Sequence, residues 1–469
     1  MGAVEFGRRT FIQATGLVTF GAWAHGPDRD WDRLRRALTG RLVRPGDDGY
    51  DTVRRPFNTV YAHRRPAAVA LCADESDVAR CLDFAATHDV PVAARSGGHS
   101  YAGYSVPENG LVIDLAALNG VDVDERGDAR IGPGARMIDV YEGLGGVGRL
   151  LPAGTCPTVG VGGLTLGGGI SVVARKYGLT CDRLLSARVV TPDGVTRHTD
   201  AQTEPDLFWA LRGGGGGNFG VVTSFTFDTE PARDLVVFLL RFPADAGVDV
   251  LGAWQEWMLG TPDEMWTACE VVAGSPPTAG VIGCWAGEER GLPPLLDRLT
   301  AKVAPTSRQV LPMDYLTTMR YFAGCLPQCA PTTGAPFVAS SRMLHRPVDP
   351  ARAVGLMEGR RAGWVQFDSF GGEIARVRPD ATAFPHRDAI ASAQAYVGVG
   401  DVSEAEARRT VADVRDGLGH NTGYVNYIDP DMPEWRTAYY GRNLARLRRV
   451  ARRYDPDHVL AFPQSVVPS

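Results

Sequence analysis

Two glycine-rich stretches each carry one nucleophilic side chain. The first reads Arg95-Ser96-Gly97-Gly98-His99, and the second, residues 154–169, contains Cys156. Glycine lets the backbone turn tightly and lets a phosphate-bearing ligand approach closely. An imidazole and a thiol in such turns can act as nucleophiles or as covalent tethers. The two stretches therefore predict a ligand site with two potential covalent anchors.

A small α/β unit leads into the first stretch. Strands are expected at 67–71, 90–94 and 111–115, and a helix at 76–88. The strand at 90–94 runs directly into the turn before His99, whose free N–H groups could hold a pyrophosphate. The turn lacks the G-x-G-x-x-G spacing of a dinucleotide helix, which disfavours a nicotinamide cofactor.

Tyrosines and a carboxylate form a second constellation. Tyr424 and Tyr427 are three residues apart, and Trp364, Gln366 and Asp368 alternate along an expected strand. Alternate strand residues share one face. Free tyrosine titrates near ~10, so a tyrosine base needs a depressed pKa or a paired acceptor, for which Asp368 is the candidate. Alternatively, the tyrosines pack a strand edge and Asp368 faces solvent.

Length and composition exclude several classes of protein. The chain has 469 residues, enough for two or more domains, and its 44% hydrophobic and 22% charged residues are typical of a soluble protein. A net charge of −5 gives no reason to expect nucleic acid. The 8 cysteines show no zinc-type spacing, so no metal site is predicted. No apolar run reaches ~18 residues, so no membrane span is expected.

The N-terminus has features of an export signal. Arg8-Arg9 precedes a modest apolar run, and Ala22-Trp23-Ala24 has the form of a signal-peptidase site. This pattern resembles a twin-arginine signal, a route that carries folded proteins. Residues 1–24 are therefore expected to be removed. The alternative is a basic N-terminal helix on a cytoplasmic protein.

Further elements follow along the chain. A hairpin is expected at Pro192-Asp193-Gly194, between strands at 185–191 and 195–198. After a five-glycine run at 213–217, a strand is expected at 221–227. Beyond about residue 231 a second α+β region is expected, with a strand at 235–242 and helices at 250–258, 351–361 and 403–418.

Together, the His99 and Cys156 loops resemble the berberine-bridge-enzyme-like branch of the vanillyl-alcohol-oxidase superfamily. The resemblance implies an α+β fold with a two-part FAD-binding domain of the PCMH type at 60–230. It also implies an α+β substrate domain with an antiparallel sheet at 231–420. A C-terminal segment, 421–469, is expected to return to the FAD domain.

The resemblance also implies residue roles. FAD is expected to be bound bicovalently, through His99 to the flavin 8α carbon and through Cys156 to ring carbon 6. Tyr427 is the expected base, with Tyr424 and Asp368 as further catalytic candidates. Tyr101, Trp364 and Gln366 are expected to bind substrate. The other expected cofactor-binding residues are Arg95, Ser96, Gly97, Gly98, Gly160, Gly162, Gly163, Gly167, Gly220, Val222 and Asn426.

The leading functional hypothesis is an FAD-dependent oxidase. It would take hydride from an alcohol C–H of a sugar, glycoside or polyketide-type metabolite and pass electrons to O2, giving H2O2. Alternatives are oxidative cyclisation of a metabolite, a non-redox cyclase on a tethered flavin, and a small-molecule sequestering protein. Ile170 replaces a tyrosine of many plant relatives, which argues against transferring their details. The particular substrate and the oligomeric state stay open.

Overall fold

The computed structural model describes residues 28–326, 328–329 and 334–467. The predicted export signal, 1–24, lies outside these residues. The first unit is a four-stranded sheet in the order β1-β2-β4-β3, in which β2, β4 and β3 are parallel. Its elements are α1 (Asp28–Ala37), β1 (Arg41–Val43), α2 (Tyr50–Val53), β2 (Ala68–Leu71), α3 (Glu75–His88), β3 (Val92–Arg95) and β4 (Leu111–Asp114).

Helix α3 shows why the sequence forms this unit. The Asp74 carboxylate caps it by accepting hydrogen bonds from the backbone N–H groups of Ser76 and Asp77. Its inward positions are fully or almost fully buried, namely Val78, Cys81, Leu82 and Ala85. Strand β3 ends at Arg95, so the His99 loop leaves the sheet directly from a half-buried strand.

A second, antiparallel sheet follows in the order β5-β6-β10-β8-β9. The predicted turn at 192–194 connects β8 to β9, and Gly194 has the positive φ of +74° that the turn requires. The elements are β5 (Val121–Val123), β6 (Asp128–Ile131), α4 (Met137–Gly145), β7 (Arg149–Leu150), α5 (Val161–Leu166), α6 (Ala174–Tyr177), β8 (Leu184–Val190), β9 (Thr196–Asp200), α7 (Pro205–Leu211), β10 (Val221–Asp228) and β11 (Glu230–Pro231).

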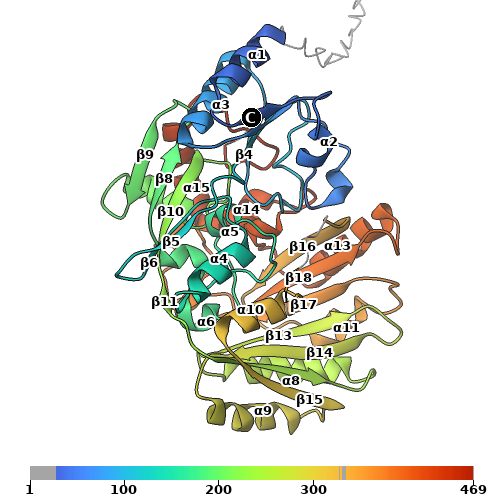
Figure 1. Cartoon of the computed structure of the whole chain (residues 1–469). Helices are drawn as coiled ribbons and strands as arrows, with labels where there is room; N and C mark the ends of the chain where they lie inside the picture. The colour runs from blue at the N-terminus through green and yellow to red at the C-terminus, as the bar shows by residue number, and fades with distance from the viewer. Residues whose placement is uncertain (1–27, 327, 330–333, 468–469) are drawn as a thin grey trace, which may run out of the picture.

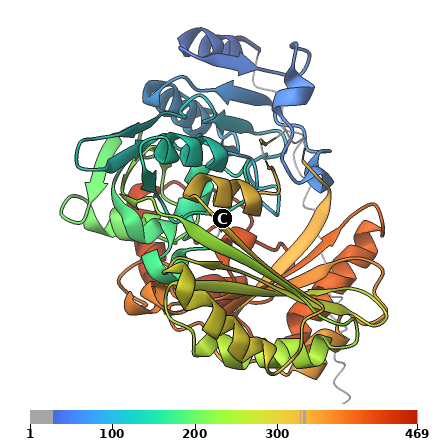
Figure 2. The same ribbon diagram turned by 60° about the horizontal axis from the view of Figure 1, so that its bottom comes forward.

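The third sheet is seven-stranded and antiparallel, in the order β15-β12-β14-β13-β17-β18-β16. Helices α8, α9, α11 and α13 cover one face, and the other face turns toward the rest of the chain (Figures 1 and 2). The elements are β12 (Leu235–Arg241), α8 (Gly247–Leu259), β13 (Met265–Val272), β14 (Thr278–Trp285), α9 (Leu292–Thr300), β15 (Ser307–Met313), α10 (Tyr315–Phe322), β16 (Phe337–Leu344), α11 (Pro350–Gly355), β17 (Trp364–Ser369), α12 (Glu373–Arg376), β18 (Ala391–Gly398) and α13 (Glu404–Gly417).

One predicted helix is shorter than expected. The helix predicted at 351–361 is α11, which begins after the Asp349 cap and ends at Gly355. A turn follows instead, in which Gly359 has a φ of +69° that no α-helix contains. The helical prediction was wrong beyond Gly355 because these glycines favour a turn.

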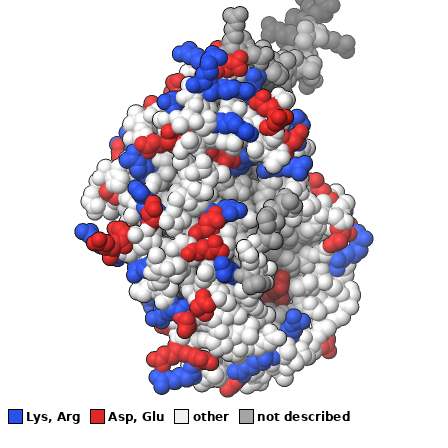
Figure 3. Space-filling model, viewed as in Figure 1, with Lys and Arg blue, Asp and Glu red and all other residues white. Residues whose placement is uncertain are grey.

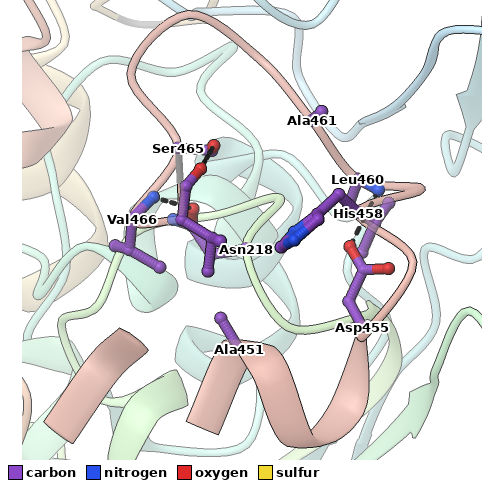
Figure 4. Close-up of a pocket in the computed structure, with 9 residues that line it drawn as sticks. Asn218, Ala451, Asp455, His458, Leu460, Ala461, Ser465 and Val466 are labelled. Carbon is purple, nitrogen blue, oxygen red and sulfur yellow. Dashed lines mark hydrogen bonds between the residues drawn. The ribbon is translucent and has the colours of Figure 1, made fainter. Parts of the chain in front are cut away.

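The C-terminal segment returns to the first half of the chain. It contains α14 (Trp435–Tyr440) and α15 (Leu444–Tyr454), and α15 packs on α7 with Arg446 in an ion pair with Asp206 at 2.6 Å. Figure 4 shows a small cavity beside it, of about 10 Å³, where Asn218 accepts a hydrogen bond from the Val466 backbone. That volume suits about one water molecule, not a substrate.

The α+β fold is confirmed.

Candidate functional site

The two glycine-rich loops lie against each other. A Cβ atom on Gly97 would be 2.3 Å from the Gly160 nitrogen, and one on Gly160 would be 1.9 Å from Ser96 Oγ. Any larger residue would separate the loops, so glycine is required at both positions. The His99 and Cys156 loops are therefore neighbours in the fold, and their joint anchoring of one ligand stays a prediction.

His99 is held between an aromatic ring and a hydroxyl group. Its ring stacks on Phe57, with centroids 3.7 Å apart and planes 20° apart, and its Nε2 lies 2.9 Å from Thr158 Oγ1. Burial lowers the pKa of His99 to about 4. The imidazole is therefore neutral near pH 7, which is the nucleophilic form.

Cys156 also contacts Thr158. The thiol has exposed surface, yet the surrounding protein desolvates it and raises its pKa, an effect that hydrogen bonds with Thr158 oppose. Thr158 thus contacts both potential anchors, a role that the sequence analysis missed because threonine at this position carries no signal of its own.

Unpartnered polar groups line these loops. Among the described hydrogen bonds, none is donated by the backbone N–H groups of Gly97, Gly98 or His99. Arg95 Nη1 and Thr165 Oγ1 are also buried without a partner among the described residues. A Cβ atom on Gly163 would meet nothing within 4 Å. Open space beside free donors fits a phosphate-bearing cofactor such as FAD.

Other predicted cofactor residues have supporting positions. Arg95 forms a buried ion pair with Asp114, and Ser96 Oγ donates to the Pro133 carbonyl at 2.5 Å. Asn426 Nδ2 donates to the Leu164 carbonyl at 2.9 Å, and its side chain fills the space beside Gly167. These contacts hold the loops in shape.

The remaining glycine and valine residues that were predicted to bind the cofactor lie in two places. Gly162 packs on Pro133, beside the Ser96 side chain. Val222 lies in strand β10 of the second sheet, where it pairs with Val189, and Gly220, which directly precedes β10, packs on the same Val189. Their contact with a cofactor stays a prediction.

The two tyrosines of the C-terminal motif differ in environment. Tyr424 is buried, and its hydroxyl accepts hydrogen bonds from the Gly169 backbone at 2.8 Å and from Asn426 at 2.9 Å. It therefore supports the end of the Cys156 loop. Tyr427 stacks on Tyr101 at 5.4 Å, and its phenol has no hydrogen-bond partner among the described residues. Tyr427 is the tyrosine whose hydroxyl is free to meet a ligand.

The acid–base properties of Tyr427 and Asp368 differ from what a tyrosine base requires, a depressed pKa or a paired acceptor. Burial raises the pKa of Tyr427 well above its ordinary value, and Tyr101 and Asp368 raise it further. The pKa is therefore not depressed. Nor does Asp368 bond Tyr427 directly: its carboxylate accepts from Gln366 at 2.7 Å and from Ser392 at 3.1 Å. Burial raises the pKa of Asp368 to about 6, close to neutrality.

Strand β17 has the predicted alternation. Val365 and Phe367 point into the core under the helices, whereas Trp364, Gln366 and Asp368 share the opposite face. Their neighbours across β18 are Tyr396, Gln394 and Ser392. This face meets the His99 loop, because Gln394 Nε2 donates to the Tyr101 hydroxyl at 2.7 Å.

Five aromatic side chains form a continuous row on this face, which we call the aromatic row. Trp364 stacks on Tyr396 at 5.0 Å and 7°, and Tyr396 stacks on Phe337 at 4.9 Å. Phe337 meets Tyr101 edge-on at 5.0 Å, and Tyr101 stacks on Tyr427. The row thus extends from the β17 strand to the free phenol of Tyr427.

Several residues of this face were not predicted from the sequence. Tyr396, Phe337 and Gln394 belong to it, as does Glu270, which pairs with Gln366 across β13 and has a pKa raised by burial. Strand β18 offered a signal, because Ser392, Gln394 and Tyr396 alternate with buried alanines. Phe337 offered none, since only the fold brings it to Tyr101.

Other chemistry is not evident in the part of the chain that the structure describes. No group of three or more His, Cys, Asp or Glu side chains there could hold a metal ion, and no helix there could span a membrane. Both charge signs are interspersed over the face in Figure 3. Cys325 and Cys329 form a disulfide, while Cys72 and Cys81 are buried as free thiols.

Comparisons with known proteins agree with this geometry. The model of the FAD binding domain matches residues 66–200, and the model of the berberine and berberine-like family matches residues 423–467. An uncharacterized FAD-linked oxidoreductase of Bacillus subtilis is 35% identical, over 92% of this chain and 97% of that protein. A chitooligosaccharide oxidase of Gibberella zeae is 31% identical, over 86% and 87%.

Solved structures show the same fold. A chitooligosaccharide oxidase superposes with a TM-score of 0.86 at 28% identity, covering 94% of this chain and 99% of that one. A glucooligosaccharide oxidase from Acremonium strictum, described with a 6-S-cysteinyl, 8α-N1-histidyl FAD, gives 0.84 at 26% identity, covering 93% and 99%. Fold and site together define an FAD-dependent oxidoreductase of the vanillyl-alcohol-oxidase type. More narrowly, the chain belongs to the berberine-bridge-enzyme-like FAD-linked oxidases.

Proposed function

We propose that this protein oxidises an alcohol C–H of an oligosaccharide, with O2 as the electron acceptor and H2O2 as product. The observation that carries the proposal is the aromatic row, which lies beside the amides of Gln366 and Gln394 and ends at Tyr427. Aromatic rings pack on the apolar faces of sugars, and amides bond their hydroxyl groups. Relatives named as oligosaccharide oxidases support this substrate class.

We further propose that FAD is attached through His99 and Cys156. The neutral imidazole, the thiol and the shared Thr158 contact support two bonds. When bound, FAD would supply the hydride acceptor and would return electrons to O2. The free N–H groups of 97–99 would bind its phosphates. We propose that the cofactor domain spans 60–230, the substrate domain 231–420, and the returning segment 421–469.

Tyr427 and Asp368 would handle the substrate proton. A phenol with a raised pKa is protonated at rest, so Tyr427 can accept a proton only as its own proton leaves. The buried carboxylate of Asp368, with a pKa of about 6, is the acceptor near enough to raise the Tyr427 pKa. We propose that the proton passes from the sugar hydroxyl through Tyr427 toward Asp368.

This relay predicts a pH dependence of substrate oxidation. Below pH about 6 the Asp368 carboxyl is protonated and cannot accept, so the rate of flavin reduction should rise as pH increases through about 6. Asp368→Asn should lower the rate less than loss of the Tyr427 phenol does, and should remove this rise. Anaerobic rapid mixing from about pH 5 to about pH 8 measures both effects. An unchanged profile in the variant would exclude Asp368 as the acceptor.

A direct screen tests the oxidase proposal. Cello-, xylo- and chito-oligosaccharides should bleach the flavin anaerobically and yield H2O2 in air. Oxidative cyclisation would instead bleach the flavin with an aromatic metabolite and give a ring-closed product, which mass spectrometry distinguishes. No bleaching with any alcohol would favour a non-redox or sequestering role.

Export is a separate proposal. Arg8-Arg9 and Ala22-Trp23-Ala24 support a twin-arginine signal cleaved after Ala24. Replacing both arginines with lysine should leave the protein in the cytoplasm, and N-terminal sequencing of exported protein should begin at His25. An N-terminus at Met1 or Gly2 on exported protein would contradict cleavage.

A further inference from the structure

A short segment, Phe57 to Thr59, lies between the His99 loop and the start of β16; we call it the bridge segment. On one side, the Phe57 backbone donates to the Gly98 carbonyl at 3.0 Å and its ring stacks on His99. On the other, Ala335 donates to the Phe57 carbonyl at 3.0 Å, and Thr59 donates to the Ala335 carbonyl at 3.2 Å. The segment therefore joins both sides of the site.

Asn58 is the only buried amide of this segment, with 1% of its surface exposed. Its Nδ2 donates to the carbonyls of Tyr101 at 2.9 Å and Phe337 at 3.0 Å. Its Oδ1 accepts from the backbone N–H groups of Phe337 and Val60, both at 3.3 Å. Two donors and two acceptors are all satisfied, which fixes the orientation of the amide.

These contacts fall at the centre of the aromatic row. Phe337 and Tyr101 are the pair that meets edge-on, and Phe337 is followed by Tyr396 and Trp364. Phe337 begins strand β16, whereas Tyr101 lies in the loop after β3, so no secondary-structure ladder sets their spacing. The side-chain amide of Asn58 bonds the backbones of Tyr101 and Phe337 and sets their spacing instead.

We propose that Asn58 is a positioning residue that holds the outer part of the aromatic row in register with the reacting end at Tyr427. The inference rests on the proposed sugar oxidation. In this arrangement the first sugar ring reacts beside Tyr427, and later rings lie toward Tyr396 and Trp364. Asn58 then determines how tightly the later rings bind, without touching the substrate.

Asn58→Asp tests the inference with almost no change in shape. The carboxylate keeps both acceptors but loses both donors, and it places charge beside the carbonyls of Tyr101 and Phe337. KM for a tetrasaccharide should rise about tenfold, while kcat changes less than about threefold. The reason is that the lost contacts bind the substrate equally well in the ground state and in the transition state. KM for a monosaccharide should change much less, and flavin content should match the parent protein.

Gln255→Glu is the matched control. Gln255 is a buried amide on α8 that exchanges hydrogen bonds with the Val348 backbone in both directions, under the opposite face of the sheet. The Gln255→Glu variant should lose a similar amount of stability. It should leave the ratio of KM for the tetrasaccharide to KM for the monosaccharide unchanged. If both variants move that ratio equally, or neither moves it, the inference is wrong.

Asn58→Ser covers the case in which the charged variant does not fold. Combined with Trp364→Ala, it forms a double-mutant cycle. If Asn58 acts through the aromatic row, the two effects on tetrasaccharide KM should be strongly non-additive. Additive effects would overturn the inference. An unaltered protein inactive on every saccharide would overturn the proposed function and this inference with it, whereas an active parent with additive variants would overturn this inference alone.

Discussion

Tyr427→Phe should slow anaerobic flavin reduction by roughly 100- to 10,000-fold, the usual effect of removing a general base. The substitution keeps the ring that stacks on Tyr101 and removes only the phenol oxygen, which has no partner among the described residues. The stability of the protein should therefore change little. The loss should appear in flavin reduction because that step contains the C–H cleavage.

Two comparisons make the result specific. Reoxidation by O2 should be nearly unchanged, since it follows substrate oxidation. Tyr440→Phe, which removes the phenol of a more deeply buried tyrosine in the C-terminal segment, should leave flavin reduction near the parent rate. Rapid-mixing spectroscopy resolves both half-reactions. A Tyr427→Phe protein that reduces its flavin at the parent rate would make Tyr101 or Asp368 the next candidate for the base.

The parts of the site that could be predicted are local in sequence. Strand β3 ends at Arg95, and the next residues of the chain form the loop that carries His99. One contiguous motif, Arg95 to His99, therefore predicts this loop. The alternation of Trp364, Gln366 and Asp368 likewise depends only on strand geometry. Each of these features is decided by a few neighbouring residues.

The parts that could not be predicted depend on distant segments. Phe57 meets His99, and Phe337 meets Tyr101, only because the bridge segment lies between the His99 loop and the start of β16. The raised pKa of Tyr427 arises from burial under several elements, which no motif reveals. Glu270 faces Gln366 because β13 lies beside β17 in the sheet order, although almost a hundred residues separate them.

The combined change His99→Ala with Cys156→Ala should release all of the flavin on acid precipitation. In the unaltered protein the flavin should stay in the pellet, because either of two bonds suffices to hold it. Each single variant should therefore also keep its flavin in the pellet, with an altered absorbance spectrum. Only the double variant loses both attachments, although the free N–H groups of 97–99 can still bind FAD without a bond.

Matched variants separate attachment from folding. Cys284→Ala removes a buried thiol from the third sheet, and His198→Ala removes an exposed imidazole from β9; both should keep all flavin in the pellet. The measurement is flavin absorbance in pellet and supernatant after precipitation. Extractable flavin from the unaltered protein would contradict covalent attachment. Flavin that stays in the pellet of the double variant would require a third attachment residue, so the assignment to His99 and Cys156 would fail.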